Sequence, residues 1–316
     1  MTDLQRTIYR DALKRSRKTI IEAAIEETSD IPSSIPSRKT RMTGRSKDKI
    51  YAENSSNVLM DLRKAALHPM LFRTRFTDET LSAITKHLLK EPDFKRRGAI
   101  AELVKEDMSV MTDSELQSTR KYLQDEACYV DAGKIQVLLG LLSEYKKDGR
   151  KILIFSQFTQ MLDILQAVLK KHAMRYLVLT GSTPVDVRQS LVDEFTEDES
   201  INIFLLSTKA GGMGINLTAA SVVIMFDQDF NPHNDRQAQD RAYRIGQKRD
   251  VEVIKLISRG TIEEDILRLG ETKLALDEAV AGDAEEKDDG TSERAMKTSL
   301  LNTLRLQLES ESIAPD

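Results

Sequence analysis

Ile201-Asn-Ile-Phe-Leu-Leu-Ser-Thr-Lys-Ala-Gly-Gly-Met-Gly-Ile-Asn216 joins a mostly apolar run to a turn with three glycines in four positions. A continuously apolar run is typical of a strand in a parallel sheet that helices cover on both faces. Glycines directly after such a strand let the backbone approach a ligand closely. A tight connection without a ligand is the alternative interpretation of this turn. It is not a Walker A loop, because the chain contains no G-x-x-x-x-G-K-[ST].

Similar β-rich runs recur on both sides of this stretch and alternate with segments of helical pattern. We expect strands over Ile152–Ser156, Tyr176–Thr180, Ile201–Ser207, Val222–Asp227 and Val251–Ile257. Between them we expect segments that are helical, or a loop followed by a helix, at Thr159–Lys171, Pro184–Phe195, Ala210–Ala219 and His233–Ile245. Five strands joined by four crossovers predict a doubly wound α/β domain, whose ligands bind at the carboxyl ends of the strands.

The last of these helices begins with clear signals. Asn231 is a favourable N-cap, Pro232 suits the first helical position, and Gly246 is placed to end the helix in a left-handed conformation. The residues between them read Gln237-Ala-Gln-Asp-Arg-Ala-Tyr-Arg-Ile-Gly-Gln247. We therefore expect one helix to carry the whole stretch.

Gln237, Arg241 and Arg244 would form one stripe on that helix, because they stand at positions i, i+4 and i+7. Two planar, permanently charged guanidinium groups on one face suit the charge that develops on a transferred phosphoryl group. The alternative is an exposed ion pair between Asp240 and Arg244, which are four residues apart. The first interpretation predicts a phosphate-binding face.

Composition excludes several functional classes. The chain has 316 residues, a formal net charge of −4 and one cysteine, so a disulfide framework within it is impossible. The histidines share no metal-ligand spacing, and we expect no metal site. No apolar run is long enough to cross a bilayer, so we expect a soluble intracellular protein without a membrane partner.

The two ends of the chain differ in charge. Residues 1–50 hold 12 Lys and Arg against 7 Asp and Glu, whereas residues 283–316 hold 9 Asp and Glu against 4 Lys and Arg. A basic end suggests a polyanionic partner and an acidic end a solvated tail. Between them, helical patterns cover residues 1–27, Val58–Leu67, Asp78–Leu89 and Asp113–Gln124.

Four quoted segments resemble successive motifs of the second RecA-like lobe of superfamily-two translocases. They are Ile152–Phe158, Leu179–Ser182, Leu206–Leu217 and Gln237–Gln247. Asp227-x-x-Phe230-Asn231-Pro232 followed by Arg-Ile-Gly-Gln is similar to the Swi/Snf-type chromatin-remodelling ATPases, although many relatives carry Trp where Phe230 stands. Phe72–Glu79, Leu89–Pro92 and Glu106–Asp113 resemble the Fun-thirty/SMARCAD subgroup of that family.

The resemblance implies roles for individual residues. Arginine fingers on the γ-phosphate would be Arg241 and Arg244, oriented by Gln237, with Gly212, Gly214, Ile215 and Asn216 at the edge of the nucleotide. The phosphates of one DNA strand would contact Ser156, Gln157, Thr180, Gly181, Thr208 and Lys209. ATP and Mg²⁺ would be held mainly by a first RecA-like lobe, whose P-loop and acidic motif this sequence lacks.

The same resemblance divides the chain. Residues 1–127 would be a helical protrusion with a flexible basic loop at 28–49, and residues 128–259 the RecA-like lobe. Residues 260–282 would be a brace helix, opened by a capping box of Thr261 and Glu264. Residues 283–316 would be an acidic flexible tail with a short amphipathic helix, whose leucines pack either on this domain or on a partner.

These expectations support two functional hypotheses. The first is the second motor lobe of a nuclear, ATP-dependent double-stranded-DNA translocase that remodels nucleosomes and cannot hydrolyse ATP without a first lobe. The second is a standalone, non-catalytic module from a truncated or split gene that binds DNA or a remodelling complex. A dinucleotide oxidoreductase is disfavoured, because no G-x-G-x-x-G follows the first strand.

Overall fold

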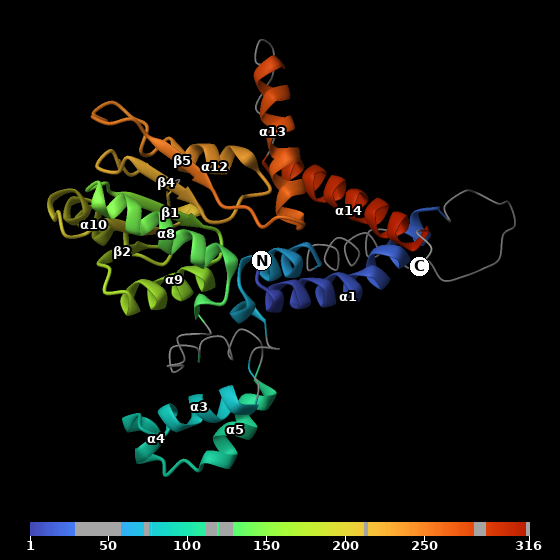
Figure 1. Cartoon of the computed structure of the whole chain (residues 1–316), viewed down its shortest axis with the longest axis horizontal. Coiled ribbons are helices and arrows are strands. Elements are labelled where there is room, and N and C mark those ends of the chain that lie inside the picture. The colour runs from blue at the N-terminus through green and yellow to red at the C-terminus, as the bar shows by residue number, and fades with distance from the viewer. Residues whose placement is uncertain are drawn as a thin grey trace, which may run out of the picture.

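The computed structural model describes residues 1–28, 58–72, 76, 78–111, 119, 129–211, 214–280 and 289–313 (Figure 1). The N-terminal elements are α1 Asp3–Thr28, a helix over 58–67, the 3₁₀ helix η1 Pro69–Leu71, α3 Asp78–Leu88, α4 Pro92–Arg96 and α5 Ala101–Val110. The sheet region contains α8 Gly133–Lys147, β1 Ile152–Ser156, α9 Thr159–Lys171, β2 Tyr176–Leu179, α10 Val185–Glu197, β3 Ile203–Ser207, α11 Thr208–Gly211, β4 Val222–Met225, α12 Pro232–Gln239 and β5 Glu252–Lys255. The C-terminal helices are α13 Ile262–Val280 and α14 Asp289–Ile313.

The five strands form one parallel sheet in the order β2-β3-β1-β4-β5. This confirms the predicted doubly wound α/β fold. β1 lies at the centre, and its Ser156 pairs with Ser207 at the end of β3. β1 and α9 have the predicted bounds, whereas β2 to β5 are shorter than expected by one to three residues. The carboxyl ends of the strands therefore meet at one edge of the sheet.

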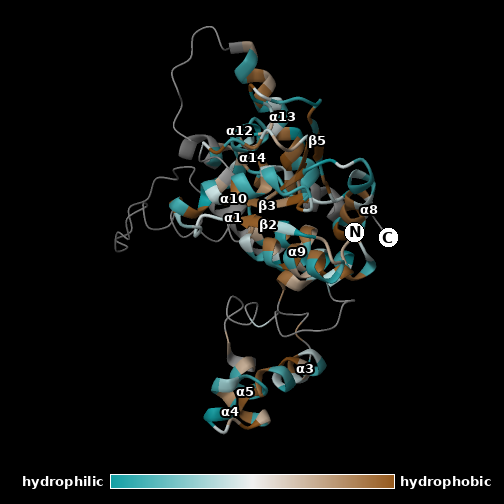
Figure 2. Ribbon diagram, turned by 90° about the vertical axis from the view of Figure 1, so that its left-hand side faces the viewer, coloured by the Kyte–Doolittle hydropathy of each residue, from teal (hydrophilic) through white to brown (hydrophobic). Residues whose placement is uncertain are grey.

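Alternation along the strands builds two hydrophobic layers, one on each face of the sheet. Ile152 and Ile154 of β1 belong to a core that also contains buried residues of α8, α9 and α13. Leu153 and Phe155 belong to a second core with buried residues of α10, α11 and α12. Successive strand residues point to opposite faces, so both sets are buried only if helices cover both sides. Figure 2 shows mostly hydrophobic strands and hydrophilic outer sides on the helices.

The N-terminal helix α1 is joined to the sheet domain by side chains that satisfy buried backbone groups. Gln5 donates through Nε2 to the carbonyls of Ala66 and Leu67, at 3.3 Å each, and accepts from the Gly133 N–H at 2.9 Å. The Tyr9 hydroxyl accepts from the Ile262 N–H, the first of α13, at 2.8 Å. These bonds fix α1 against the helix over 58–67 and against the start of α13.

The start of α13 differs in one detail from the expected capping box. The Thr261 hydroxyl accepts from the Glu263 N–H at 3.2 Å, as an N-cap residue should. The Glu264 carboxylate, however, accepts from the Gly260 N–H at 2.8 Å rather than from the N–H of Thr261. Gly260 has a φ of +70°, and this left-handed turn presents its N–H to the first turn of the helix.

The tail helix is longer than expected. α14 spans 25 residues, and its Met296, Leu300 and Leu304 are buried in the main hydrophobic core. It contacts α1 and α13. Of the two alternatives for its leucine stripe, packing on its own domain is therefore correct for these positions.

Helices α3, α4 and α5 stand apart from the sheet domain in both views of the chain (Figures 1 and 2). α3 and α5 contact each other and bury Leu81, Ile84, Leu88, Val104 and Met108. The predicted helix at Val58–Leu67 is confirmed, and His68 ends it by capping η1. The predicted loop at 28–49, the helix at Asp113–Gln124 and the connector around 282–288 lie almost entirely outside the described residues.

Truncating Leu300 tests whether α14 is an integral part of the core. We expect Leu300→Ala to lower the free energy of unfolding by about 2–5 kcal/mol, because it leaves a cavity in a fully buried site. Leu306→Ala on the same helix is the matched control, since that side chain is 65% exposed. Urea unfolding measures both variants. Equal, small losses would show that α14 does not pack on the domain.

Candidate functional site

The predicted DNA-contacting residues lie along the carboxyl edge of the sheet. Ser156 ends β1, Thr180 follows β2 and Thr208 follows β3, and these three strands are neighbours in the order β2-β3-β1. Gln157, Gly181 and Lys209 directly follow them. The register pairs Leu179 with Leu206 and Ser156 with Ser207, so the three strand ends are level. The fold brings all six residues to one edge.

These six residues are not equally available to a ligand. Lys209 and Gly181 are exposed, and Thr180 is half-buried with its hydroxyl 2.8 Å from that of Ser182. The Thr208 hydroxyl is buried and has no hydrogen-bond partner among the described residues. Ser156 is fully buried and donates its hydroxyl to the Asp227 carboxylate. Ser156 therefore organises the edge from within, whereas Lys209 and the Thr180 turn face outward.

A buried arginine that the sequence analysis did not single out joins the helix over 58–67 to this edge. Arg63, on the helix over 58–67, is 2% exposed and donates through Nη2 to the Gln228 carbonyl at 2.5 Å and to Gln157 Oε1 at 3.1 Å. The same nitrogen lies 3.7 Å from the Asp227 carboxylate. Its guanidinium centre lies 5.0 Å from the ring centroid of Phe158 and 4.6 Å from that of Phe230.

Asp227 is the anion at the centre of this network. Its carboxylate accepts from the Gln157 N–H at 3.0 Å as well as from Ser156. Complete burial raises the pKa of the Asp227 carboxyl, while the charge of Arg63 and these hydrogen bonds oppose the rise. A buried carboxylate held by a buried guanidinium fixes the backbone at the end of β1 and β4.

Two further carboxylates follow Asp227 around the start of α12. Asp235 accepts from the Asp229 N–H at 3.0 Å, but its second oxygen is buried without a hydrogen-bond partner among the described residues. Burial raises the pKa of the Asp235 carboxyl to about 7, and the charges of Asp229 and Asp227 add to the increase. The bond from Asp229 and the charge of Arg63 oppose it. Asp227, Asp229 and Asp235 thus lie close enough for their negative charges to raise the pKa of Asp235, and Arg63 opposes this effect.

The glycine-rich turn contains less helix than predicted. α11 covers only Thr208–Gly211 instead of the expected Ala210–Ala219. Gly214 has a φ of +80°, and Asn216 Oδ1 accepts from the Thr218 N–H at 3.3 Å, a local bond that competes with helix. Ile215 is half-buried and Asn216 is exposed. Gly212 lies outside the described residues.

The predicted arginine stripe is wrong as a helical feature. α12 begins at Pro232 with Asn231 as N-cap, as expected, but it ends at Gln239. The chain then tightens through i to i+3 bonds, from Arg241 N–H to the Ala238 carbonyl and from Ala242 N–H to the Gln239 carbonyl. Gln237 is exposed on the helix, whereas both arginines follow it in a turn.

Long-range hydrogen bonds hold the segment after α12 in a non-helical course. The Arg241 carbonyl accepts from the Leu217 N–H at 3.1 Å, and Gln247 donates through Nε2 to the carbonyls of Ala220 and Ala242 at 2.7 and 3.0 Å. Carbonyls that would bond along a continuing helix are thereby engaged elsewhere. Gly246 does adopt a positive φ of +105°, but in a loop well past the end of the helix. These bonds also join the glycine-rich segment to the arginine turn.

The two arginines differ in exposure. Arg241 is 6% exposed, and burial followed by the neighbouring charge of Arg244 lowers the pKa of its guanidinium. Arg244 is exposed. Only Arg244 could meet a ligand in this arrangement without movement of the turn.

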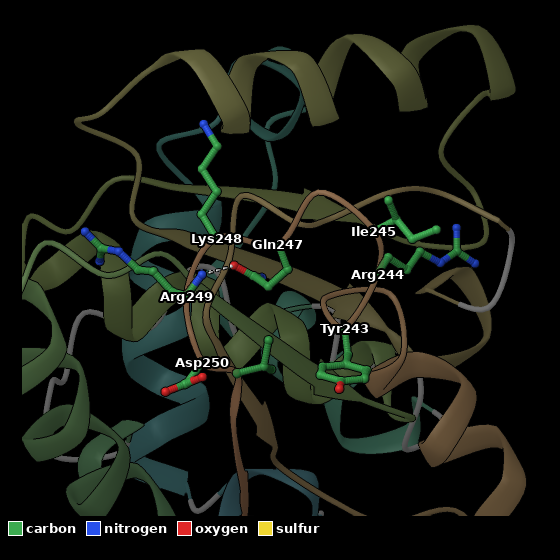
Figure 3. A pocket seen from close by; sticks show the side chains of 8 residues that line it. Tyr243, Arg244, Ile245, Gln247, Lys248, Arg249 and Asp250 are labelled. Atoms are coloured by element: carbon green, nitrogen blue, oxygen red, sulfur yellow. Dashed lines mark hydrogen bonds between the residues drawn. The ribbon is translucent and has the colours of Figure 1, made fainter.

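Beyond the arginine turn, residues 243–251 surround an open hollow of about 1060 Å³ (Figure 3). Its lining includes Arg244, Lys248 and Arg249 against one acid, Asp250. The three basic side chains extend from the loop in different directions (Figure 3). An excess of cations favours an anionic ligand, but these groups do not converge on one point. Lys248 and Arg249 were missed by the sequence analysis, although they directly follow Gln247.

The described part of the chain contains neither a cluster of metal ligands nor a membrane-spanning helix. No group of three or more potential metal ligands occurs among those residues. None of the helices described there is long and apolar enough to cross a membrane.

Comparison with known proteins assigns the sheet domain to a family. Residues 133–246 match the helicase conserved C-terminal domain. A curated human relative, the SWI/SNF-related matrix-associated actin-dependent regulator of chromatin subfamily A containing DEAD/H box 1, is 47% identical over 257 residues, which cover 79% of this chain and 25% of that protein. The ATP-dependent helicase FUN30 of Saccharomyces cerevisiae is 46% identical over 253 residues, covering 77% of this chain and 22% of that protein.

A solved structure extends the similarity over almost the whole chain. The crystal structure of the C-terminal part of the Fun30 ATPase domain is 37% identical, with a TM-score of 0.71, and the match covers 98% of this chain and 94% of that one. The chain spans about a quarter or less of the length of the curated relatives it matches.

The pH dependence of stability tests the environment of Asp235. Its pKa is about 7 when folded and near the ordinary 3.8 when unfolded, so its contribution to stability is complete below about pH 4 and is lost as the pH rises to 7. One pKa unit corresponds to about 1.4 kcal/mol, so the full loss is on the order of 4 kcal/mol. We expect urea unfolding of Asp235→Asn between these pH values to show a smaller decline than the wild type. Asp193→Asn, an exposed site on α10, is the control. Parallel curves for wild type and Asp235→Asn would refute the assignment.

Proposed function

The chain belongs to the helicase C-terminal domain family and groups with Swi/Snf-type remodellers of the FUN30 and SMARCAD1 kind, and on that premise we propose that it is the second motor lobe of an ATP-dependent DNA translocase. In this proposal it remodels nucleosomes in the nucleus by moving double-stranded DNA. ATP and Mg²⁺ are held mainly by a first RecA-like lobe, in cis or in trans. The family relationship supports DNA and nucleosomes as partners.

One observation carries this proposal: the glycine-rich segment and the arginine turn are bonded to each other at the edge that also bears the DNA-contact residues. The Leu217 N–H to Arg241 carbonyl bond joins the two loops, and Thr208 and Lys209 precede the same glycine-rich segment. A change in nucleotide at one loop can therefore displace the other. In a motor, such a connection transmits lobe closure to the grip on DNA.

The proposed contacts with DNA are of the positioning kind. Lys209, Thr180 and Gly181 would face phosphates, together with Gln157, which Arg63 holds. The Thr208 hydroxyl is buried and would join the row only after a movement that exposes it. Ser156 would act indirectly, through its bond to Asp227. Contacts to phosphates fix orientation and register without reading base sequence. Sequence-independent binding is what a translocating lobe requires.

The proposed contacts with ATP require movement. Arg244 is exposed, and Gln237, Gly214, Ile215 and Asn216 flank the turn, but Arg241 is buried. We infer that closure onto a nucleotide held by the first lobe shifts the turn after α12 and brings Arg241 to the γ-phosphate beside Arg244. Together they would act as arginine fingers, which increase turnover by about 10³–10⁵-fold in other enzymes.

A second candidate is a non-catalytic module that binds DNA or a remodelling complex. The burial of Arg241 and the divergence of Arg244, Lys248 and Arg249 favour it, because these cations form no completed phosphate site among the described residues (Figure 3). The two candidates differ in one observable. Only the motor lobe restores ATP hydrolysis when a first lobe is supplied.

We expect no DNA-stimulated ATP hydrolysis by this chain alone, and hydrolysis at about 1–100 s⁻¹ when a first lobe from a relative is fused or added. Arg244→Ala should lower that rate by about 10³-fold or more. Arg236→Ala is the matched control, because Arg236 lies on α12 but pairs with Glu278 of α13 at 2.7 Å. Hydrolysis by the isolated chain, or an Arg244→Ala fusion with wild-type turnover, would contradict the proposal.

A further inference from the structure

Basic side chains gather at one end of the helical unit formed by α3, α4 and α5. Residues 86–97 contain five basic residues against two acidic ones, Glu91 and Asp93. The five are all exposed and are Lys86, Lys90, Lys95, Arg96 and Arg97. The remainder of the unit is acidic, with Asp78 and Glu79 in the first turn of α3 and Glu102 in that of α5. Positive charge is therefore segregated around α4.

None of these five side chains is paired within the part of the chain that the structure describes. Within the described residues, Lys105 pairs with Asp78 at 3.5 Å, and none of the five cations takes part in an ion pair. Glu91 and Asp93, although adjacent in sequence, form no ion pair with them in the described chain. Their positive field is thus directed to solvent rather than neutralised locally.

Helix stabilisation accounts for only part of this arrangement. Lys86 in the last turn of α3, and Lys95 and Arg96 in the last turn of α4, complement the negative ends of the helix dipoles. Arg97, the C-cap of α4, shares in this benefit, whereas Lys90 lies two residues beyond the end of α3. Lys86 and Lys90 are also four residues apart, a spacing at which like charges repel when the turn is helical. Helix stabilisation therefore does not account for Lys90.

The unit is built to present this charge rigidly and away from the sheet domain. Buried Leu81, Ile84 and Leu88 of α3 pack with Val104 and Met108 of α5 in the local core. Gly98, at a φ of +62°, turns the chain from α4 toward α5. Both views show the three helices apart from the sheet, and α4 is mostly hydrophilic (Figures 1 and 2).

We propose that the basic surface around α4, made of Lys86, Lys90, Lys95, Arg96 and Arg97, is a second contact site for duplex DNA phosphates, separate from the carboxyl edge of the sheet. The preference for DNA over another polyanion rests on the proposed function, since a chain that moves along DNA has this polyanion beside it. Exposed lysines and arginines that are not paired with acids bind a phosphate backbone by releasing its counterions. The site increases affinity and orients the chain without reading base sequence.

Salt-dependent binding of the full chain to a fluorescent duplex of about 30 base pairs tests the site. The variant is Lys95→Gln, Arg96→Gln and Arg97→Gln combined, and circular dichroism checks that it folds. Loss of three phosphate contacts lowers the slope of log affinity against log salt by about 2.7, at roughly 0.9 per contact. Between about 50 and 200 mM salt, the wild type should then lose about 40-fold more affinity than the variant.

The matched control removes three exposed lysines from another surface, by Lys146→Gln, Lys147→Gln and Lys170→Gln on α8 and α9. It makes the same change in net charge and should leave the slope nearly unchanged. Equal slopes for the α4 variant and the wild type, equal losses in both triple variants, or no binding of the wild type at low salt would overturn the proposal. A loss of poly-glutamate binding in the α4 variant with unchanged duplex binding would overturn it too, and would identify an acidic protein partner.

Two further measurements, duplex binding by Lys209→Gln and ATP hydrolysis with an added first lobe, test the α4 surface separately from the motor function. If Lys209→Gln weakens duplex binding and the α4 variant does not, the sheet edge is the DNA site and the α4 surface is not one. If the α4 variant weakens binding but an added first lobe restores no ATP hydrolysis, the surface is confirmed and the motor function fails.

Discussion

The guanidinium of Arg63 is the constraint on which the functional edge of this protein depends. It is buried, carries a permanent charge, and lies between the rings of Phe158 and Phe230. A buried charge is tolerated only when it is paired and hydrogen-bonded. Asp227, the Gln228 carbonyl and Gln157 satisfy it, and each belongs to a segment at the carboxyl end of β1 or β4. The helix over 58–67 is therefore part of the site, not only a neighbour of the sheet.

A second buried ion pair, between Lys134 and Glu263, also fixes the end of β4. Lys134 of α8 is buried and donates to the Phe226 carbonyl at 2.7 Å and to Glu263 at 2.6 Å. Glu263 in turn accepts from the Ser258 N–H at 2.8 Å. Two buried ion pairs thus lie at the end of β4 and connect it to α8, to α13 and to the helix over 58–67. Removing one partner from such a pair leaves an uncompensated charge, so the end of β4 has little freedom to move. The loops that follow β4 can move while the end of the strand stays fixed.

The sequence predicted those elements whose bounds are determined by the residue pattern within one segment. β1 and α9 were predicted to the residue, because a continuous apolar run and a well-spaced apolar stripe are signals within one segment. The end of α12 could not be predicted in this way. The segment that follows it is held by a bond between Leu217 and Arg241, which are distant in sequence, and a local helical pattern carries no sign of such a bond. Arg63 gave no signal either, because an arginine in an amphipathic helix ordinarily marks the solvent side. The sequence thus predicted which residue types line the site, but it did not predict which of these side chains are buried.

A double-mutant cycle on Arg63 and Asp227 tests the central claim most directly. Unfolding free energies would be measured for Arg63→Met, Asp227→Asn, and the two combined. If the pair fixes the carboxyl edge as described, each single variant loses stability and the double variant loses less than the sum, with a coupling of about 1–3 kcal/mol. Losses that add to within about 0.5 kcal/mol would show that the two residues do not act together. The account of the edge would then be wrong.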